Sequence, residues 1–155
     1  MLKKVEKQRI KEIADKLDNI IFLDYDGVLN IAINNNGEKR FSLECINNLN
    51  KLCNNYNFQI VVISSWRKSP KYKEMLYASG LDKNIIIKGR IDCLNDGTTR
   101  EEKIIRYLKE NIYIDKFLIL DDGPYEKLAN YQVRTDFNKG FNHEKYEETI
   151  KLLSK

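Results

Sequence analysis

Four apolar residues run directly into two aspartates in the stretch Ile20-Ile21-Phe22-Leu23-Asp24-Tyr25-Asp26-Gly27-Val28-Leu29. A short, unbroken apolar run predicts a strand that is buried on both faces of a parallel sheet. In open α/β sheets, ligands bind beyond the carboxyl ends of the strands, which is where Asp24 and Asp26 fall. Gly27 allows the sharp turn that must follow. The stretch therefore predicts an α/β fold with a functional site at this strand end.

The spacing of the two aspartates indicates what the site binds. Residues i and i+2 of an extended segment face the same way, so both carboxylates can point into one pocket. Two close carboxylates repel each other unless a cation lies between them or one of them holds a proton. A hard divalent cation with oxygen ligands meets that need, and Mg²⁺ is the candidate we favour.

Length and composition narrow the class of protein. The chain has 155 residues, of which 32% are charged, and its net charge of +4 permits an anionic partner without requiring one. Its three cysteines lack the spacing of a zinc site and predict reduced thiols in a cytoplasmic setting. No apolar run reaches the length of a membrane span, and the N-terminus lacks the apolar core of a secretion signal. We expect one domain over residues 1–155, with an accessory helix over 1–19 and a catalytic core over 20–153.

Hydrophobic periodicity and turn residues predict the remaining elements. The first helix is amphipathic and is expected to lie against the sheet, with a partner-binding helix as the alternative. A small hairpin is expected over 28–41, around the turn at 34–37. The other elements are helices over 3–18, 42–56, 69–79, 98–110 and 143–153, and strands over 20–23, 58–63, 84–88, 117–120 and 132–135.

Polar groups also follow a second apolar strand. Residues 58–63 end in Ser64, Ser65, Trp66 and Arg67, and a hydroxyl with a guanidinium is suited to holding phosphoryl oxygens. The alternative is that Ser64 or Ser65 caps the next helix and that Arg67 is solvated.

Two further patterns point to the same pocket. The strand over 117–120 stops at Asp121-Asp122, a second apolar run that ends in paired carboxylates; a solvated turn is the alternative. Arg100 and Lys103 fall in the first turn of a predicted helix, where the helix dipole disfavours cations. We therefore expect at least one of these two to face an anion, with ordinary exposed charges as the alternative.

This order of strand ends resembles the haloacid dehalogenase (HAD) superfamily of phosphohydrolases. The similarity spans about residues 20–153. Residues 24–29 match the first motif, Ser64 the second, Arg100 or Lys103 the third, and Asp121-Asp122 the fourth. Residues 64–67, 100–108, 120–122, 135–136 and 140–141 resemble the HAD domain of Swiss Army Knife RNA repair-like proteins. Lys103 stands where that subgroup tends to have an acid, so the third-motif cation stays open, with Arg100 favoured.

The resemblance implies a three-layer Rossmann-like fold, a central parallel sheet flanked by helices, with minimal or no cap domain. It implies a Mg²⁺-dependent phosphatase in which Asp24 attacks phosphorus and forms an aspartyl-phosphate, while Asp26 protonates the leaving oxygen and then activates water. The implied metal site consists of Asp24, the backbone carbonyl of Asp26, and Asp121 or Asp122. The implied phosphate-binding residues are Ser64, Ser65, Arg67 and either Arg100 or Lys103.

The spacing of the motifs bears on the substrate. Only 37 residues separate Asp26 from Ser64, which leaves no room for a substantial lid. An open site favours a large substrate, such as an RNA or DNA end or a nucleotide phosphate. Residues 66–90 carry seven basic and two acidic side chains, which suits a polynucleotide backbone but also an ordinary solvated helix face. The alternatives are a small-metabolite or protein phosphatase, and a non-catalytic module that binds phosphate or nucleic acid.

Overall fold

The computed structural model describes residues 1–15, 17–31 and 41–155, and its centre is a five-stranded sheet. All strand pairs are parallel, in the order β3-β2-β1-β4-β5. The strands are β1 (Asp18–Leu23), β2 (Phe58–Val62), β3 (Ile87–Arg90), β4 (Ile114–Asp121) and β5 (Gln132–Arg134). The fold is the expected α/β, Rossmann-like arrangement.

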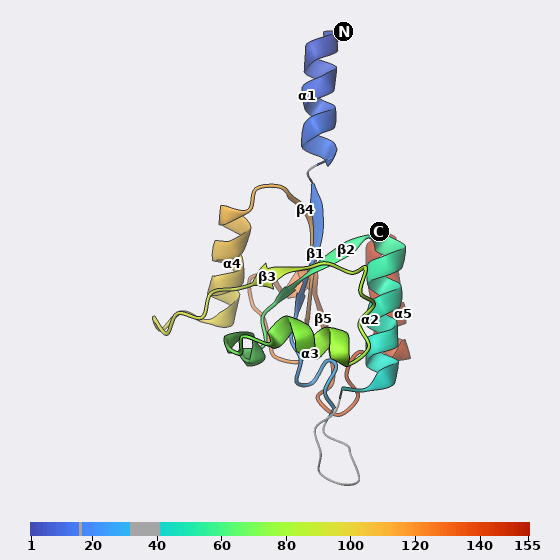
Figure 1. The fold of residues 1–155 in the computed structure, drawn as a ribbon, viewed down its shortest axis with the longest axis vertical. Helices are drawn as coiled ribbons and strands as arrows, with labels where there is room; N and C mark the ends of the chain where they lie inside the picture. Colours follow the sequence, from blue (N-terminus) through green and yellow to red (C-terminus); the bar gives the residue numbers. More distant parts are fainter. Residues whose placement is uncertain (16, 32–40) are drawn as a thin grey trace.

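Helices cover both faces of the sheet, so the molecule has three layers (Figure 1). Alternate residues of β1 contribute to two separate cores: Ile21 and Leu23 to the larger one, Ile20 and Phe22 to the other. Figure 1 shows α4 on one side of the sheet and α2 with α5 on the other. The helices are α1 (Lys4–Asp15), α2 (Leu43–Tyr56), α3 (Tyr72–Ala78), α4 (Arg100–Glu110) and α5 (His143–Leu153).

Side-chain caps account for where three of these helices begin. The hydroxyl of Ser42 accepts from the amide of Cys45 at the start of α2, and Asn142 accepts from Lys145 at the start of α5. At α4, Thr99 forms a reciprocal capping box with Glu102. This box fixes the first turn of α4, and with it Arg100, against the carboxyl ends of the strands.

The first helix forms but does not pack against the sheet, which corrects the sequence-based expectation. Val5 and Ile10 are 79% and 54% exposed, and α1 projects away from the body (Figure 1). Helical periodicity indicates an apolar stripe, but it carries no information about what covers that stripe.

Other elements differ from the prediction mainly at their ends. The helix expected over 69–79 is shorter in the structure, because α3 begins at Tyr72, after Pro70, which has no amide hydrogen. A 3-10 turn that was not expected, η1 (Ser65–Lys68), precedes it. The third strand runs over Ile87–Arg90 rather than 84–88. A second 3-10 turn, η2 (Ala129–Tyr131), precedes β5. The hairpin predicted over 28–41 falls largely on residues 32–40, outside the described residues. None of the described helices has the length and apolar character needed to cross a membrane.

Candidate active site

The register of the sheet brings the acidic strand ends together. Leu23, the last residue of β1, pairs with Val62 of β2 on one side and with Leu120 of β4 on the other. The amide of Asp24 then donates to the carbonyl of Leu120 at 3.0 Å. Because parallel strands end at the same edge, Asp24 comes to lie beside the carboxylates that follow Leu120.

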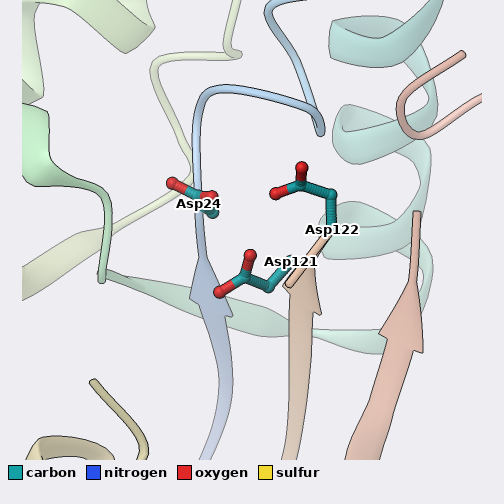
Figure 2. Close-up of side chains that lie close together, drawn as sticks. All are labelled: Asp24, Asp121 and Asp122. Atoms are coloured by element: carbon teal, nitrogen blue, oxygen red, sulfur yellow. The ribbon is translucent and has the colours of Figure 1, made fainter. Parts of the chain in front are cut away.

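Three carboxylates converge at this edge. One oxygen from each of Asp24, Asp121 and Asp122 lies within 4.8 Å of the others. Figure 2 shows that Asp24 comes from the end of one strand, and Asp121 and Asp122 from the end of its neighbour. Asp24 and Asp121 are buried, and Asp122 is half-buried. Such a group of oxygen ligands can hold a hard divalent cation.

The turn after Asp26 requires glycine for two reasons. Gly27 has φ +80°, a conformation that L side chains rarely adopt, and a Cβ there would lie 2.6 Å from Cγ of Asp122. The carbonyl of Gly27 accepts from the hydroxyl of Thr135 at 2.6 Å, which ties the turn to the segment after β5. The backbone therefore passes directly over the Asp122 carboxylate.

Asp26 lines the same cavity and is not one of the three clustered carboxylates. Its Oδ1 accepts a hydrogen bond of 2.8 Å from the side-chain amide of Asn30. This bond fixes one oxygen of the Asp26 carboxylate beside the cavity.

Arg100 is the cation that faces the acidic group. Its guanidinium lies 2.9 Å from Oδ2 of Asp121 and 3.3 Å from Oδ2 of Asp24. The hydroxyl of Tyr125 donates to the same Asp121 oxygen at 2.7 Å, and the amide of Gly123 donates to the other oxygen at 3.0 Å. Arg100 lies in the first turn of α4, where the helix dipole disfavours a cation. Its contacts with Asp24 and Asp121 offset that effect.

Burial and charge separate the pKa values of these carboxyl groups. Burial, followed by the negative charge of Asp121, raises the pKa of Asp24 to about 7, although Arg100 opposes this shift. Burial also acts to raise the pKa of Asp121, but the Gly123 amide, the Tyr125 hydroxyl and Arg100 together lower it. Burial and the charge of Asp121 raise the pKa of Asp122. Part of the rise in the pKa values of Asp24 and Asp122 thus comes from repulsion by Asp121, which a divalent cation would relieve.

The acidic group opens into a cavity of about 670 Å³. Ser65 is on its wall, whereas neither Ser64 nor Arg67 is among the described lining residues. The lining consists of Asp24, Asp26, Ser65, Thr99, Arg100, Glu101, Asp121, Asp122, Gly123, Pro124, Tyr125, Glu126 and Phe137.

Three candidate phosphate-binding residues, Ser64, Arg67 and Lys103, are not among the described lining residues of the cavity and make other contacts. Ser64 is buried and its hydroxyl accepts from the amide of Trp66, so it caps η1. The guanidinium of Arg67 donates to the carbonyl oxygens of Asp92, Ile63 and Ser64, and so holds loops together. The ammonium of Lys103 lies 2.6 Å from Asp92, a contact that satisfies it outside the cavity.

Sequence reasoning missed some residues of the site. Tyr125 contacts Asp121, and its only signal was its position four residues later in a turn-forming sequence. Glu101 accepts from the amides of Glu126 and Leu128 and fixes the loop after β4. Phe137 lines the cavity although it is 49% exposed. These contacts depend on tertiary structure, and spacing along the chain does not reveal them.

Comparison with known protein families identifies the class of protein to which this parallel sheet with acidic strand ends belongs. A model of the HAD domain in Swiss Army Knife RNA repair proteins matches residues 20–146. The chain belongs to this family of HAD domains.

No curated protein matches the chain. Among solved structures, a crystal structure of a hypothetical protein from Xanthomonas campestris is similar, with 12% sequence identity and a TM-score of 0.45. The similarity covers 92% of this chain and 86% of that one.

Proposed function

We propose that the protein is a Mg²⁺-dependent phosphatase that works through an aspartyl-phosphate on Asp24. The observation that carries the proposal is the convergence of Asp24 with Asp121 and Asp122 at one strand edge, beside Arg100 and at the wall of an open cavity. A pure phosphate-binding module has no use for buried carboxylates that face an anion, because they repel it. Membership of a HAD family supports the same chemistry.

In the proposed reaction, Asp24 and Asp26 carry out different steps. An oxygen of Asp24 attacks phosphorus as the bond to the leaving oxygen breaks, and Asp26 gives that oxygen a proton. Water then attacks the phosphorus of the aspartyl-phosphate, Asp26 takes the proton, and inorganic phosphate leaves as Asp24 is regenerated. Mg²⁺ held by Asp24 with Asp121 or Asp122 would neutralise charge on the phosphoryl oxygens.

The phosphoryl oxygens need donors besides the metal. Arg100 is available for this role, because it lines the cavity and its guanidinium already lies against the nucleophile. Ser65 also lines the cavity and can add a hydroxyl. We infer that the third-motif cation is Arg100, since the ammonium of Lys103 is bound by Asp92.

The substrate in this proposal is an RNA or DNA end or a nucleotide phosphate. The described connection between β3 and α4 is a short loop over residues 91–99, so it adds no lid there. The family description, which refers to RNA repair, supports the same substrate. The basic segment over 66–90 supports it less, since Arg67 and Arg90 bond to backbone carbonyls and Lys88 pairs with Asp18.

Two alternative functions predict different experimental results. A small-metabolite or protein phosphatase would prefer sugar phosphates or phosphopeptides over phosphorylated oligonucleotides. A non-catalytic module would bind RNA tightly and release no phosphate with any metal. The free thiols of Cys45, Cys53 and Cys93 agree with a reducing, cytoplasmic setting, which is part of the proposal.

The test is hydrolysis of p-nitrophenyl phosphate with and without Mg²⁺, followed by a panel of phosphorylated oligonucleotides, nucleotides, sugar phosphates and phosphopeptides. Asp24→Asn and Asp121→Asn should abolish turnover. Asp115→Asn is the matched control, because Asp115 is exposed near the opposite end of β4. Full activity in Asp24→Asn would rule out the nucleophile.

A further inference from the structure

Asn30 ends the turn that follows Asp26, and its side chain is directed back onto that carboxylate. Its Nδ2 donates to Oδ1 of Asp26 at 2.8 Å. Its backbone amide donates to the carbonyl of Tyr25 at 2.9 Å, and its carbonyl accepts from the amide of Gly27 at 2.9 Å. These bonds fix both the backbone and the side chain of Asn30 relative to Asp26.

Among the described residues, the oxygen of the Asn30 amide has no partner. The residue is 6% exposed, and its Oδ1 has no hydrogen-bond partner among the described residues. A buried acceptor without a partner disfavours folding, so such groups are rare in native proteins. Turning the amide over would place that oxygen against the Asp26 carboxylate, where two acceptors would repel. The amide is therefore held in the orientation that serves Asp26.

We propose that Asn30 is a positioning residue that decides which oxygen of Asp26 transfers the proton. An amide nitrogen can only donate, so Oδ1 of Asp26 is kept as an acceptor and the transferable proton is carried on Oδ2. That proton passes from Oδ2 to the leaving oxygen as the phosphorus–oxygen bond breaks. Oδ2 later takes a proton from the water that attacks the aspartyl-phosphate. This inference rests on the proposed function.

The test compares two leaving groups of similar shape. Phenoxide needs protonation to leave, whereas p-nitrophenoxide is a weak enough base to leave without it. Asn30→Leu keeps the size of the side chain and removes both the donor and the unpartnered oxygen. We expect kcat/KM for phenyl phosphate to fall about tenfold or more, and kcat/KM for p-nitrophenyl phosphate to change by less than about threefold.

Thermal stability and a double-mutant comparison with Asp26 distinguish a positioning role of Asn30 from a purely structural one. The Tm of Asn30→Leu should be unchanged or higher, because the variant removes a buried acceptor that has no partner among the described residues. Asp26 borders the cavity, where water can replace the lost donor. In an Asp26→Asn background, Asn30→Leu should cause no further loss of activity. Asn30→Met, a second uncharged side chain that cannot donate, provides a further variant and should show the same selective loss for phenyl phosphate.

The outcomes distinguish the two proposals. Equal losses for both esters, or a further loss in the Asp26→Asn background, would overturn the role of Asn30 and leave the phosphatase intact. A wild-type protein that releases no phosphate from either ester with any divalent cation would overturn the proposed function, and the role of Asn30 with it.

Discussion

Replacing Asp24 with asparagine should stabilise the metal-free protein at neutral and alkaline pH, although it abolishes the proposed catalysis. The pKa of Asp24 is raised from 3.8 to about 7, chiefly by burial and then by the charge of Asp121. Between these pH values the folded state binds more protons than the unfolded state, so the free energy of unfolding falls as the pH rises. The stabilising contribution of the protonated carboxyl is complete below about pH 4 and lost as the pH rises through about 7.

The raised pKa sets the size of the effect. Each pKa unit corresponds to about 1.4 kcal/mol, so ionisation of Asp24 costs the folded state up to about 4 kcal/mol at pH 8. For a chain of this length, 1 kcal/mol shifts Tm by about 2–4 °C, which gives a ceiling of about 8–16 °C. The lowered pKa of Asp121 acts at more acidic pH, so it does not mask the effect between pH 5 and 8. The raised pKa of Asp122 acts in the same direction in both proteins and cancels in the comparison.

The assay is thermal unfolding of the wild type and Asp24→Asn at pH 5, 6, 7 and 8, in EDTA and in Mg²⁺. In EDTA the variant should melt several degrees above the wild type at pH 8, and the difference should shrink towards pH 5. Mg²⁺ should raise the Tm of the wild type, since it binds the folded state, and should raise that of the variant much less. Asp115→Asn is the matched control and should follow the wild type throughout. The reasoning is refuted if Asp24→Asn melts below the wild type at pH 8 in EDTA, or gains as much from Mg²⁺.

Further predictions concern the residues around Asp121. Tyr125→Phe removes the hydroxyl that donates to Asp121, so Mg²⁺ affinity measured by calorimetry should fall about 10-fold or more with little change in Tm; unchanged affinity would contradict this role. Lys103→Met removes the ammonium bound by Asp92 and should lower the free energy of unfolding by about 1–3 kcal/mol in urea denaturation, while kcat stays within about threefold. Arg100→Met should instead lower kcat about 100-fold or more, as expected for a donor to the reacting phosphoryl group. The opposite pattern for these two variants would make Lys103 the third-motif cation.

Local signals predicted much of the fold because they follow directly from backbone geometry. The apolar runs before Asp24 and Asp121 correspond to β1 and β4, which pair side by side in the sheet. The capping residues Ser42 and Thr99 placed the starts of α2 and α4 within a residue or two. Strand ends in a parallel sheet meet at one edge, so the sequence also predicts that Asp24, Asp121 and Asp122 gather there.

The chain order alone could not say what each long polar side chain contacts. Arg100 and Lys103 stand one helical turn apart, yet one reaches the carboxylates of the cavity and the other binds Asp92. Arg67 follows a strand end as a phosphate clamp would, but its guanidinium is used by backbone carbonyls. Flexible side chains of this length can reach partners in several directions, and loop packing selects among them.

The sequence by itself determined the parallel sheet, the helices that cover it and the edge at which acidic groups collect, because hydrophobic period and capping act over a few neighbouring residues. Only the tertiary structure decided that α1 stands clear of the sheet, that Tyr125 supports Asp121 and that Asn30 holds Asp26. Those outcomes depend on how loops and side chains from distant parts of the chain fill the same space. Hydrogen bonding and burial in the folded protein decide which of these contacts form, and the spacing of residues along the chain does not predict them.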